Sequence, residues 1–200
     1  MNDTLIIGDV HGKVDKYWKL LQQNLRSRSI QVGDFGFEAQ HLWHLANVDS
    51  DKHKINFGNH DDYTFLHERH SLGNWSWDIE RDLMTVRGAF SIDRVHRTEN
   101  ISWWANEEMN YEEMQQAVDA FILYKPSIVV THDCPHEVSK HLFGGNIKNQ
   151  IKTTTGNGLQ VMFESHQPDL WIFGHHHREE DEMIDGTRFI CLEELGTFKI

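Results

Sequence analysis

Five short polar blocks carry most of the residue types that could do chemistry in this chain. They read GDVHG at 8–12, GDFG at 33–36, GNHD at 58–61, THD at 131–133 and GHHH at 174–177. Their aspartate, asparagine and histidine side chains supply oxygen and nitrogen ligands of the kind that borderline divalent metals accept. The candidate metal ligands are Asp9, His11, Asp34, Asn59, His132, His175 and His177.

The number of ligands predicts two metal ions rather than one. Seven are too many for one tetrahedral or octahedral ion that must also leave room for water, but they suit two ions sharing a carboxylate. The mixed oxygen and nitrogen set favours manganese, iron, zinc or nickel over calcium or magnesium. Two ions about 3.5–4 Å apart can hold a hydroxide and clamp a phosphoryl group during in-line displacement. The chemistry that follows is hydrolysis of a phosphate ester, with manganese as the first choice of cofactor.

The remaining histidines have a simpler interpretation. The chain contains 15 of them, and an isolated histidine is most often a surface residue or a hydrogen-bonded core residue. Those outside the blocks are interpreted in this way. His176 lies between two candidate ligands at the end of a predicted strand, and we expect its side chain to point away from theirs.

Each block follows a short apolar run, which indicates that the polar residues lie at the carboxyl ends of strands. We predict these strands over 4–7, 29–32, 53–57, 127–130 and 170–173. Apolar residues at helical spacing predict helices over 14–25, 38–48 and 107–124, with a short helix over 61–70. Three consecutive strand–helix units predict an α/β fold with a mixed or parallel sheet covered by helices.

The other segments are less regular. Short strands are predicted over 83–86 and 89–92, on either side of Gly88. A hairpin is predicted over 182–184 and 187–192, because Asp185-Gly186 is a typical turn pair between two β-prone runs. A last strand is expected over 197–200. The segment 143–158 has no apolar period, and we interpret it as a mobile loop that could cover the site.

Composition limits the class of protein. At 200 residues the chain is expected to form one domain, residues 1–200. No segment approaches the roughly 20 apolar residues of a membrane span, and the first residues resemble a strand rather than a signal peptide, so we expect a cytoplasmic protein without a membrane partner. The net charge of −12 argues against a stable complex with duplex nucleic acid. Cys134 and Cys191 lack CxxC spacing and are interpreted as reduced thiols.

In their order and strand context, the five blocks resemble those of the calcineurin-like metallophosphoesterase superfamily. Its blocks run DxH, GDxx, GNHD or GNHE, H and GHxH, and the resemblance spans residues 8–177. It implies a two-sheet β-sandwich flanked by helices, with four layers in the order α/β/β/α. The short length of this chain is similar to that of compact bacterial and phage-type members.

The resemblance also assigns roles to single residues. It implies two ligand sets that share Asp34 as a bridging and therefore catalytic residue. The first consists of Asp34, Asp9, His11 and His177. The second consists of Asp34, Asn59, His132 and His175. Asn59 is also expected to contact the substrate. His60, which is next to Asn59 but is not itself a ligand, is the candidate general acid that protonates the leaving oxygen.

One block departs from the protein phosphatase branch of the superfamily. In that branch the second block reads GDxxDRG and supplies an Asp that orients the acid and an Arg that binds phosphate. This chain reads GDFGFEA, with Phe37 at the position of that Asp. His60 must then be oriented by another group, with Asp61 and Asp62 adjacent. Arg87, which precedes Gly88 in RGAFSIDRVHR, is the preferred phosphate-binding arginine; Arg94 and Arg97 are interpreted as surface residues or as alternatives.

Three functions remain open at this point. The first is a metal-dependent phosphatase acting on phosphomonoesters, whose substrate is a phosphorylated small molecule, a nucleotide or a phosphopeptide. The second is a phosphodiesterase for nucleotides or single-stranded nucleic acid, for which Trp103 and Trp104 could stack a base instead of filling a core. The third is a scaffold without catalysis that binds metal and a partner. No ligand position is replaced and His60 is present, which favours an enzyme.

Overall fold

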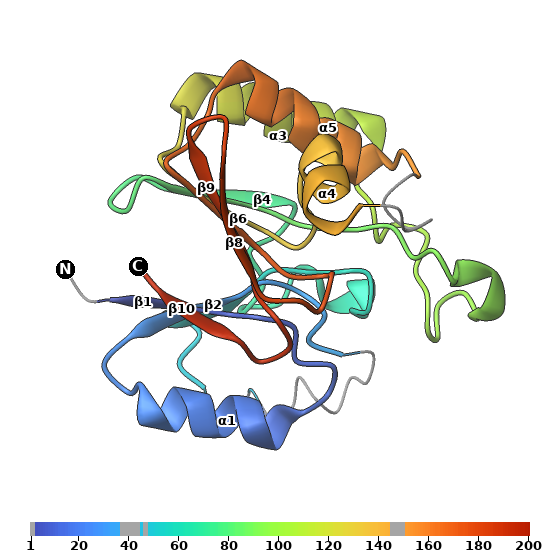
Figure 1. Cartoon of the computed structure of the whole chain (residues 1–200). Helices are drawn as coiled ribbons and strands as arrows, with labels where there is room; N and C mark the ends of the chain where they lie inside the picture. Colours follow the sequence, from blue (N-terminus) through green and yellow to red (C-terminus); the bar gives the residue numbers. More distant parts are fainter. Residues whose placement is uncertain (1–2, 37–44, 46–47, 145–150) are drawn as a thin grey trace.

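Two mixed β-sheets lie face to face, with helices on their outer sides (Figure 1). The computed structural model describes residues 3–36, 45, 48–144 and 151–200. One sheet has the strand order β10-β1-β2-β3, and the other has the order β4-β5-β6-β7-β9-β8. The expected α/β fold, a two-sheet sandwich with helices outside, is therefore confirmed.

The four-stranded sheet carries the first three polar blocks. Its strands β1 (Thr4–Ile7), β2 (Arg28–Gln31) and β3 (His53–Ile55) run parallel, and β10 (Thr197–Lys199) pairs antiparallel with β1. Helix α1 (Val14–Gln23) covers its outer face because its buried residues recur at helical spacing. Because β1, β2 and β3 run parallel, their carboxyl ends lie at the same edge of the sheet.

The six-stranded sheet carries the other two blocks. Its parallel strands are β5 (Leu83–Val86), β6 (Ile128–Thr131), β7 (Leu170–Phe173) and β9 (Thr187–Cys191). Antiparallel edge strands close it on both sides, β4 (Trp75–Asp78) and β8 (Glu180–Ile184). Helices α3 (Tyr111–Tyr124), α4 (His136–Phe143) and α5 (Thr154–Ser165) lie on its outer face (Figure 1).

Three apolar clusters hold the layers together. The middle cluster joins the two sheets through side chains such as Ile6 and Val32 from one sheet region and Val130 and Ile172 from the other. The second packs α1 on the small sheet, and the third packs α3, α4 and α5 on the large one. These contacts fix the two sheets relative to each other and therefore fix the distance between their loops.

Two of the outer helices approach each other closely. Gly158 of α5 faces the side chain of Met114 of α3, and a Cβ atom at Gly158 would collide with the sulfur. Thr153 caps α5 by accepting a hydrogen bond from the N–H of Gly156 at 2.9 Å. The glycines that suggested a loop thus belong to a capped, tightly packed helix, and the prediction of a loop over 143–158 was wrong for residues 154–158.

Several predicted boundaries also need correction. Helix α3 begins at Tyr111 and not at 107, because Asn110 and Glu113 form a capping box. Residues 89–92 form no strand, and 61–70 contain only the short 3₁₀ turn η2 (Tyr63–Phe65). The predicted helix over 38–48 lies largely outside the described residues. Strand β4 and helix α4 were not predicted.

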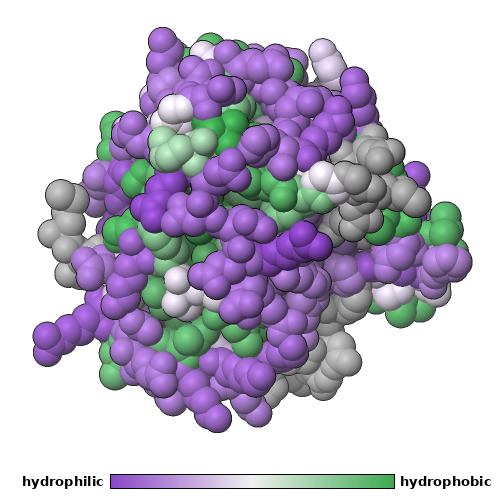
Figure 2. Space-filling view, in the orientation of Figure 1, coloured by the Kyte–Doolittle hydropathy of each residue, from purple (hydrophilic) through white to green (hydrophobic). Residues whose placement is uncertain are grey.

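The surface view agrees with a polar exterior. Figure 2 shows a mostly hydrophilic face interrupted by small apolar patches. A segment that includes the 3₁₀ turn η3 (Arg94–His96) projects from the body (Figure 1) and exposes Ile92, Val95 and Ile101. Among the described residues, no helix has both the length and the apolar character needed to cross a bilayer.

Candidate metal centre

The five polar blocks meet in space between the two sheets. Strands β1, β2 and β3 lead into Asp9, Asp34 and Asn59, while β6 and β7 lead into His132 and His175. Because the sandwich stacks the carboxyl ends of both sheets on one side, residues more than 160 positions apart in the chain become neighbours, as His175 N–H and Asp9 do at 3.1 Å.

The first ligand set is gathered as the sequence predicts. Potential ligand atoms of Asp9, His11, Asp34 and His177 all lie within 4.8 Å of one another. The Nε2 atoms of His11 and His177 are 3.0 Å apart, and His177 Nε2 lies 3.2 Å from Asp9 Oδ2. Two imidazole nitrogens and a buried carboxylate that converge in this way are arranged as ligands around one point.

The second set shares Asp34 with the first. Ligand atoms of Asp34, His132 and His175 also lie within 4.8 Å of one another. His132 Nε2 is 3.2 Å from Asp34 Oδ1 and 3.3 Å from Asn59 Oδ1, which brings the amide oxygen of Asn59 to the same place. All seven predicted ligands are therefore brought together, and Asp34 belongs to both groups.

The chemistry of Asp34 fits a metal ligand. Its carboxylate is buried, and within the described part of the chain its Oδ2 atom has no hydrogen-bond partner. Burial alone would raise the pKa of Asp34, but the neighbouring histidines, His132 foremost, outweigh burial and hold it below its usual range. An ionised, buried oxygen without a donor is costly unless a cation satisfies it.

The backbone at the site is strained. His11, Asp34, His175 and His177 have φ angles of 45°, 57°, 64° and 53°. This left-handed region is uncommon for residues with a Cβ atom, and such residues cluster at functional sites. All four residues lie in the turns that follow β1, β2 and β7.

Two glycines let these side chains approach. A Cβ atom at Gly58 would collide with Asp34 Oδ1 and lie 2.5 Å from His132 Nε2. A Cβ atom at Gly174 would collide with Asp9 Oδ1. The glycines in GNHD and GHHH are therefore required by the close packing of the ligands.

Asp61 organises the turns around Asp34. Its buried carboxylate accepts hydrogen bonds from the backbone N–H groups of Asp34 at 2.8 Å, Gly58 at 2.8 Å and Gly36 at 3.0 Å. Asp62 caps the turn η2 through the N–H of Thr64. Asp61 thus holds backbone N–H groups of the turns, and Asp62 holds the N–H and the hydroxyl of Thr64.

Asn59 is oriented by a relay that the sequence did not indicate. Its Nδ2 donates to Ser91 Oγ at 3.0 Å, and Ser91 donates from its hydroxyl and its N–H to the buried Glu107 carboxylate at 2.6 and 2.7 Å. Because the amide nitrogen is engaged there, the amide oxygen faces His132 and the second ligand set. Ser91 and Glu107 thereby orient the candidate ligand Asn59.

The predicted general acid lies beside the ligands. The ring of His60 packs edge-on against that of His11, with centroids 5.1 Å apart, and the backbone N–H of His60 donates to Asp34 Oδ1 at 2.7 Å. Arg97 Nη2 lies 2.7 Å from His60 Nε2. An arginine can only donate, so Nε2 accepts this bond. Burial, with the Arg97 charge, lowers the pKa of His60 to about 4 against the opposing charge of Asp34.

An open cavity of about 210 Å³ adjoins the ligands. It is lined by Asp34, Asn59, His60, Phe90, Ile92, Asp93, Arg97, His175 and His177. Arg97 is held in the wall by Asp93, at 2.8 Å. The cavity places one arginine, one histidine and the ligand cluster around a single space.

Arg87, the arginine preferred from the sequence, does not line this cavity. Its side chain is 1% exposed, its Nε donates to Asn74 and its Nη1 donates to the carbonyl of Asn106. Its guanidinium also lies over the ring of Tyr63, at 4.8 Å. The neighbouring Gly88, whose N–H pairs with the Phe57 carbonyl, marks a close backbone contact instead of a substrate contact.

Trp104 of the tryptophan pair and His176 also have defined positions. Trp104 is 4% exposed and belongs to the core around α1, so it fills a core and offers no exposed face for a base. His176 stacks on Phe143 and faces Asp133 and Cys134, so it turns away from the two ligand sets. The departure at Phe37 lies outside the described residues.

Known proteins share this fold. A family model described as calcineurin-like phosphoesterase matches residues 3–179. The phosphopantetheinyl hydrolase PptH of Mycobacterium tuberculosis matches 100% of this chain and 95% of its own, with 15% identity and a TM-score of 0.63. Among curated proteins, none matches the sequence significantly.

Two further solved structures have the same architecture. A Staphylococcus aureus protein assigned as a 5'-nucleotidase gives 15% identity and a TM-score of 0.53, covering 97% of this chain and 49% of its own. This chain thus spans about half the length of that protein. GAP50, the anchor in the inner membrane complex of Plasmodium, gives 11% identity and a TM-score of 0.52, covering 99% of this chain and 77% of its own.

We predict that Asp34→Asn abolishes the binding of both ions, because one side chain belongs to both ligand sets. Activity should fall by more than about 100-fold, since even residues that only support a ligand cost 10- to 100-fold. The measurement is the number of metal equivalents per protein after desalting. Asp119→Asn, on the surface of α3, is the matched control. Two retained ions with normal turnover would contradict the bridging position.

Proposed function

We propose that this chain, which belongs to the calcineurin-like phosphoesterase family, hydrolyses small phosphomonoesters with the help of two divalent metal ions. Manganese is the first choice for both ions. The observation that carries the proposal is the sharing of Asp34 by two complete sets of ligand side chains. A single set of ligand side chains, enough for one ion, would support only the binding of metal. Two sets around one buried carboxylate support a clamp on a phosphoryl group.

The ligand assignment in this proposal follows the geometry. Asp9, His11 and His177 would hold one ion and Asn59, His132 and His175 the other, with Asp34 common to both. Ions bound there would lower the pKa of a water molecule and neutralise the charge of the phosphoryl oxygens. The protein's part is to hold these side chains, most of them buried, in one arrangement before the substrate arrives.

The size of the cavity favours a small substrate. Its volume of about 210 Å³ is below the roughly 300–1,000 Å³ of sites that enclose drug-sized ligands. Phe90 and Ile92 give it an apolar wall that could contact the non-phosphate part of an ester. A nucleic-acid strand needs an extended basic groove and stacking platforms, whereas Trp104 is buried. These features favour a phosphorylated small molecule, or the phosphoryl end of a nucleotide or phosphopeptide.

Arg97 replaces Arg87 as the phosphate-binding arginine in this proposal. Its guanidinium lies in the cavity wall beside the ligands, and Asp93 holds it there through an ion pair at 2.8 Å. A planar guanidinium suits two oxygens of a phosphoryl group. Arg94, three residues earlier, lies over the rings of Phe90 and Trp103 and is assigned no role in phosphate binding.

His60 and Arg97 then act in sequence. Without substrate, Arg97 donates to His60 Nε2. A phosphoryl oxygen carries more negative charge than an imidazole nitrogen and accepts a stronger bond from a guanidinium. Substrate would therefore draw Arg97 away and leave Nε2 able to hold a proton for the leaving oxygen. Arg97 in this way controls when His60 can carry a proton.

The proposed function is tested by comparing hydrolysis of p-nitrophenyl phosphate and bis(p-nitrophenyl) phosphate by the manganese-loaded protein. We expect the monoester to be turned over faster, because its two ionised oxygens satisfy both the ions and Arg97. A strong preference for the diester would favour the phosphodiesterase alternative. No turnover of either ester, unchanged by His60→Ala, would favour the scaffold.

We predict that His60→Ala lowers kcat by roughly 10²–10⁴-fold for alkyl phosphates, whose leaving group needs a proton. The loss should be much smaller for p-nitrophenyl phosphate, because nitrophenolate leaves without protonation. The ratio of the two losses, measured at saturating manganese, is the readout. Equal losses for both substrates would show that His60 supports the site in another way.

We predict that Arg97→Ala lowers kcat/KM by roughly 10- to 100-fold, because the phosphoryl group loses one or two charge-assisted hydrogen bonds from the guanidinium. Metal content should be unchanged, because Arg97 contacts His60 and Asp93 but belongs to neither ligand set. Arg94→Ala is the matched control from the same short segment and should retain normal kcat/KM. Two results would restore Arg87 as the phosphate-binding arginine. One is an Arg97 variant with wild-type kcat/KM, and the other is an Arg87 variant that alone loses phosphate affinity while it keeps its stability.

A further inference from the structure

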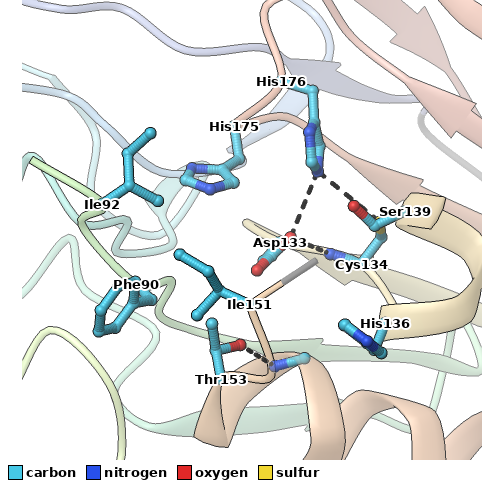
Figure 3. Close-up of a pocket in the computed structure, with 11 residues that line it drawn as sticks. Phe90, Ile92, Asp133, Cys134, His136, Ser139, Ile151, Thr153, His175 and His176 are labelled. Carbon is cyan, nitrogen blue, oxygen red and sulfur yellow. Dashed lines mark hydrogen bonds and ion pairs between the residues drawn. The ribbon is translucent and has the colours of Figure 1, made fainter. Parts of the chain in front are cut away.

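A third group of ligand-type side chains lies beside the two ligand sets. It consists of Asp133 and Cys134, just after β6, and His176, just after β7. One ligand atom from each lies within 4.8 Å of the others. Figure 3 shows His176 directed toward Asp133 and Cys134, in contrast to His175. The proposed phosphoester chemistry does not use these residues.

The distances in this group also suit side chains that share one ion, and His176 Nε2 lies within hydrogen-bond reach of Cys134 Sγ. His176 Nε2 is 3.4 Å from Asp133 Oδ1 and 3.8 Å from Cys134 Sγ. A good N–H···O bond measures about 2.7–3.2 Å. Around a tetrahedral zinc ion, Zn–N, Zn–O and Zn–S lengths of about 2.0, 2.0 and 2.3 Å separate nitrogen from oxygen by about 3.3 Å and nitrogen from sulfur by about 3.6 Å. The observed separations match that geometry.

The surroundings hold these side chains in place. The ring of His176 stacks on Phe143, with centroids 4.1 Å apart and planes at 18°. Asp133 Oδ1 accepts a hydrogen bond from the Cys134 N–H at 2.8 Å. Asp133 is 8% exposed and Cys134 is 1% exposed. A carboxylate, a thiol and an imidazole that are buried and oriented in this way provide a preformed set of three ligands.

A separate observation points to a ligand at the same place. A small cavity of about 20 Å³ adjoins the group and is lined by Asp133, Cys134, His176 and His136, among others. His136 is 94% buried, and within the described residues its Nε2 atom has no hydrogen-bond partner. A cavity of this size holds one water molecule or one ion. His136 Nε2 is thus available as a fourth ligand or as a partner for a bound water.

We propose that Asp133, Cys134 and His176 bind a single zinc-type ion, distinct from the two ions of the phosphoesterase centre. Thiolate and imidazole together favour zinc or a similar metal over manganese, magnesium or calcium. The ion would tie the segment after β6 to the segment after β7. Since His132 precedes Asp133 and His176 stands between His175 and His177, this tie would hold the neighbouring phosphoesterase ligands in position.

Cobalt substitution tests the site because Co²⁺ bound to a thiolate gives a charge-transfer band in the near ultraviolet. We expect the wild-type protein, loaded with Co²⁺ under reducing conditions and desalted, to show this band. Cys134→Ser should lose the band and about one equivalent of metal. Cys191→Ser, which removes the other buried thiol, is the matched control and should retain both.

Two further variants separate this proposal from the proposed function. Asp34→Asn should lose the phosphoesterase ions but keep the charge-transfer band. His176→Gln should lose the band while Cys134 remains, which keeps the test decisive where Cys134→Ser fails to fold. A wild-type protein without the band, a band that survives Cys134→Ser, or equal metal content in the wild type and a folded His176→Gln variant would each overturn the third site.

Discussion

The hydrogen bonds of the Asp61 carboxylate are the constraint on which the rest of the site depends. One buried side chain receives three backbone N–H groups from the turns that follow β2 and β3. Burial and the nearby charge of Asp34 raise the pKa of Asp61 to about 7, and the hydrogen bonds from Gly58 and Gly36 oppose that rise. This carboxylate locks the turn that carries Asp34 against the turn that carries Asn59. Asp34, the proposed bridging ligand, and the neighbouring Asn59 are therefore held in one arrangement.

The sequence indicated which side chains would meet, because each candidate ligand follows a recognisable strand. A short apolar run, a glycine and a polar residue form a local pattern. Because the strands run parallel, the polar residues at their carboxyl ends meet at the same edge of the sheet. The identity of the phosphate-binding arginine could not be predicted in this way. Arg87 and Arg97 stand in the same irregular segment, and only the fold shows that Asn74 and Asn106 engage one while the other lines the cavity.

The missed elements have similar physical causes. Helix α5 contains glycines that lower its helical signal, yet tertiary packing on Met114 requires one of them. The relay from Ser91 and Glu107 to Asn59 spans 48 residues of sequence, and no local pattern marks its members. Segment 90–107 thus supports a metal ligand and lines the substrate cavity at the same time. Changes there can alter substrate preference while the ligand blocks stay constant.

With metal bound as proposed, the left-handed backbone of His11, Asp34, His175 and His177 would link the stability of the protein to the supply of metal. Each such residue costs on the order of 1–3 kcal/mol when nothing compensates for it. Ions that bind only the folded chain offset this cost, by about 2.7 kcal/mol when free metal exceeds the dissociation constant 100-fold. The folded population then tracks the concentration of free metal in its surroundings. Under metal starvation the chain would unfold and be degraded more readily, and its abundance, as well as its activity, would fall.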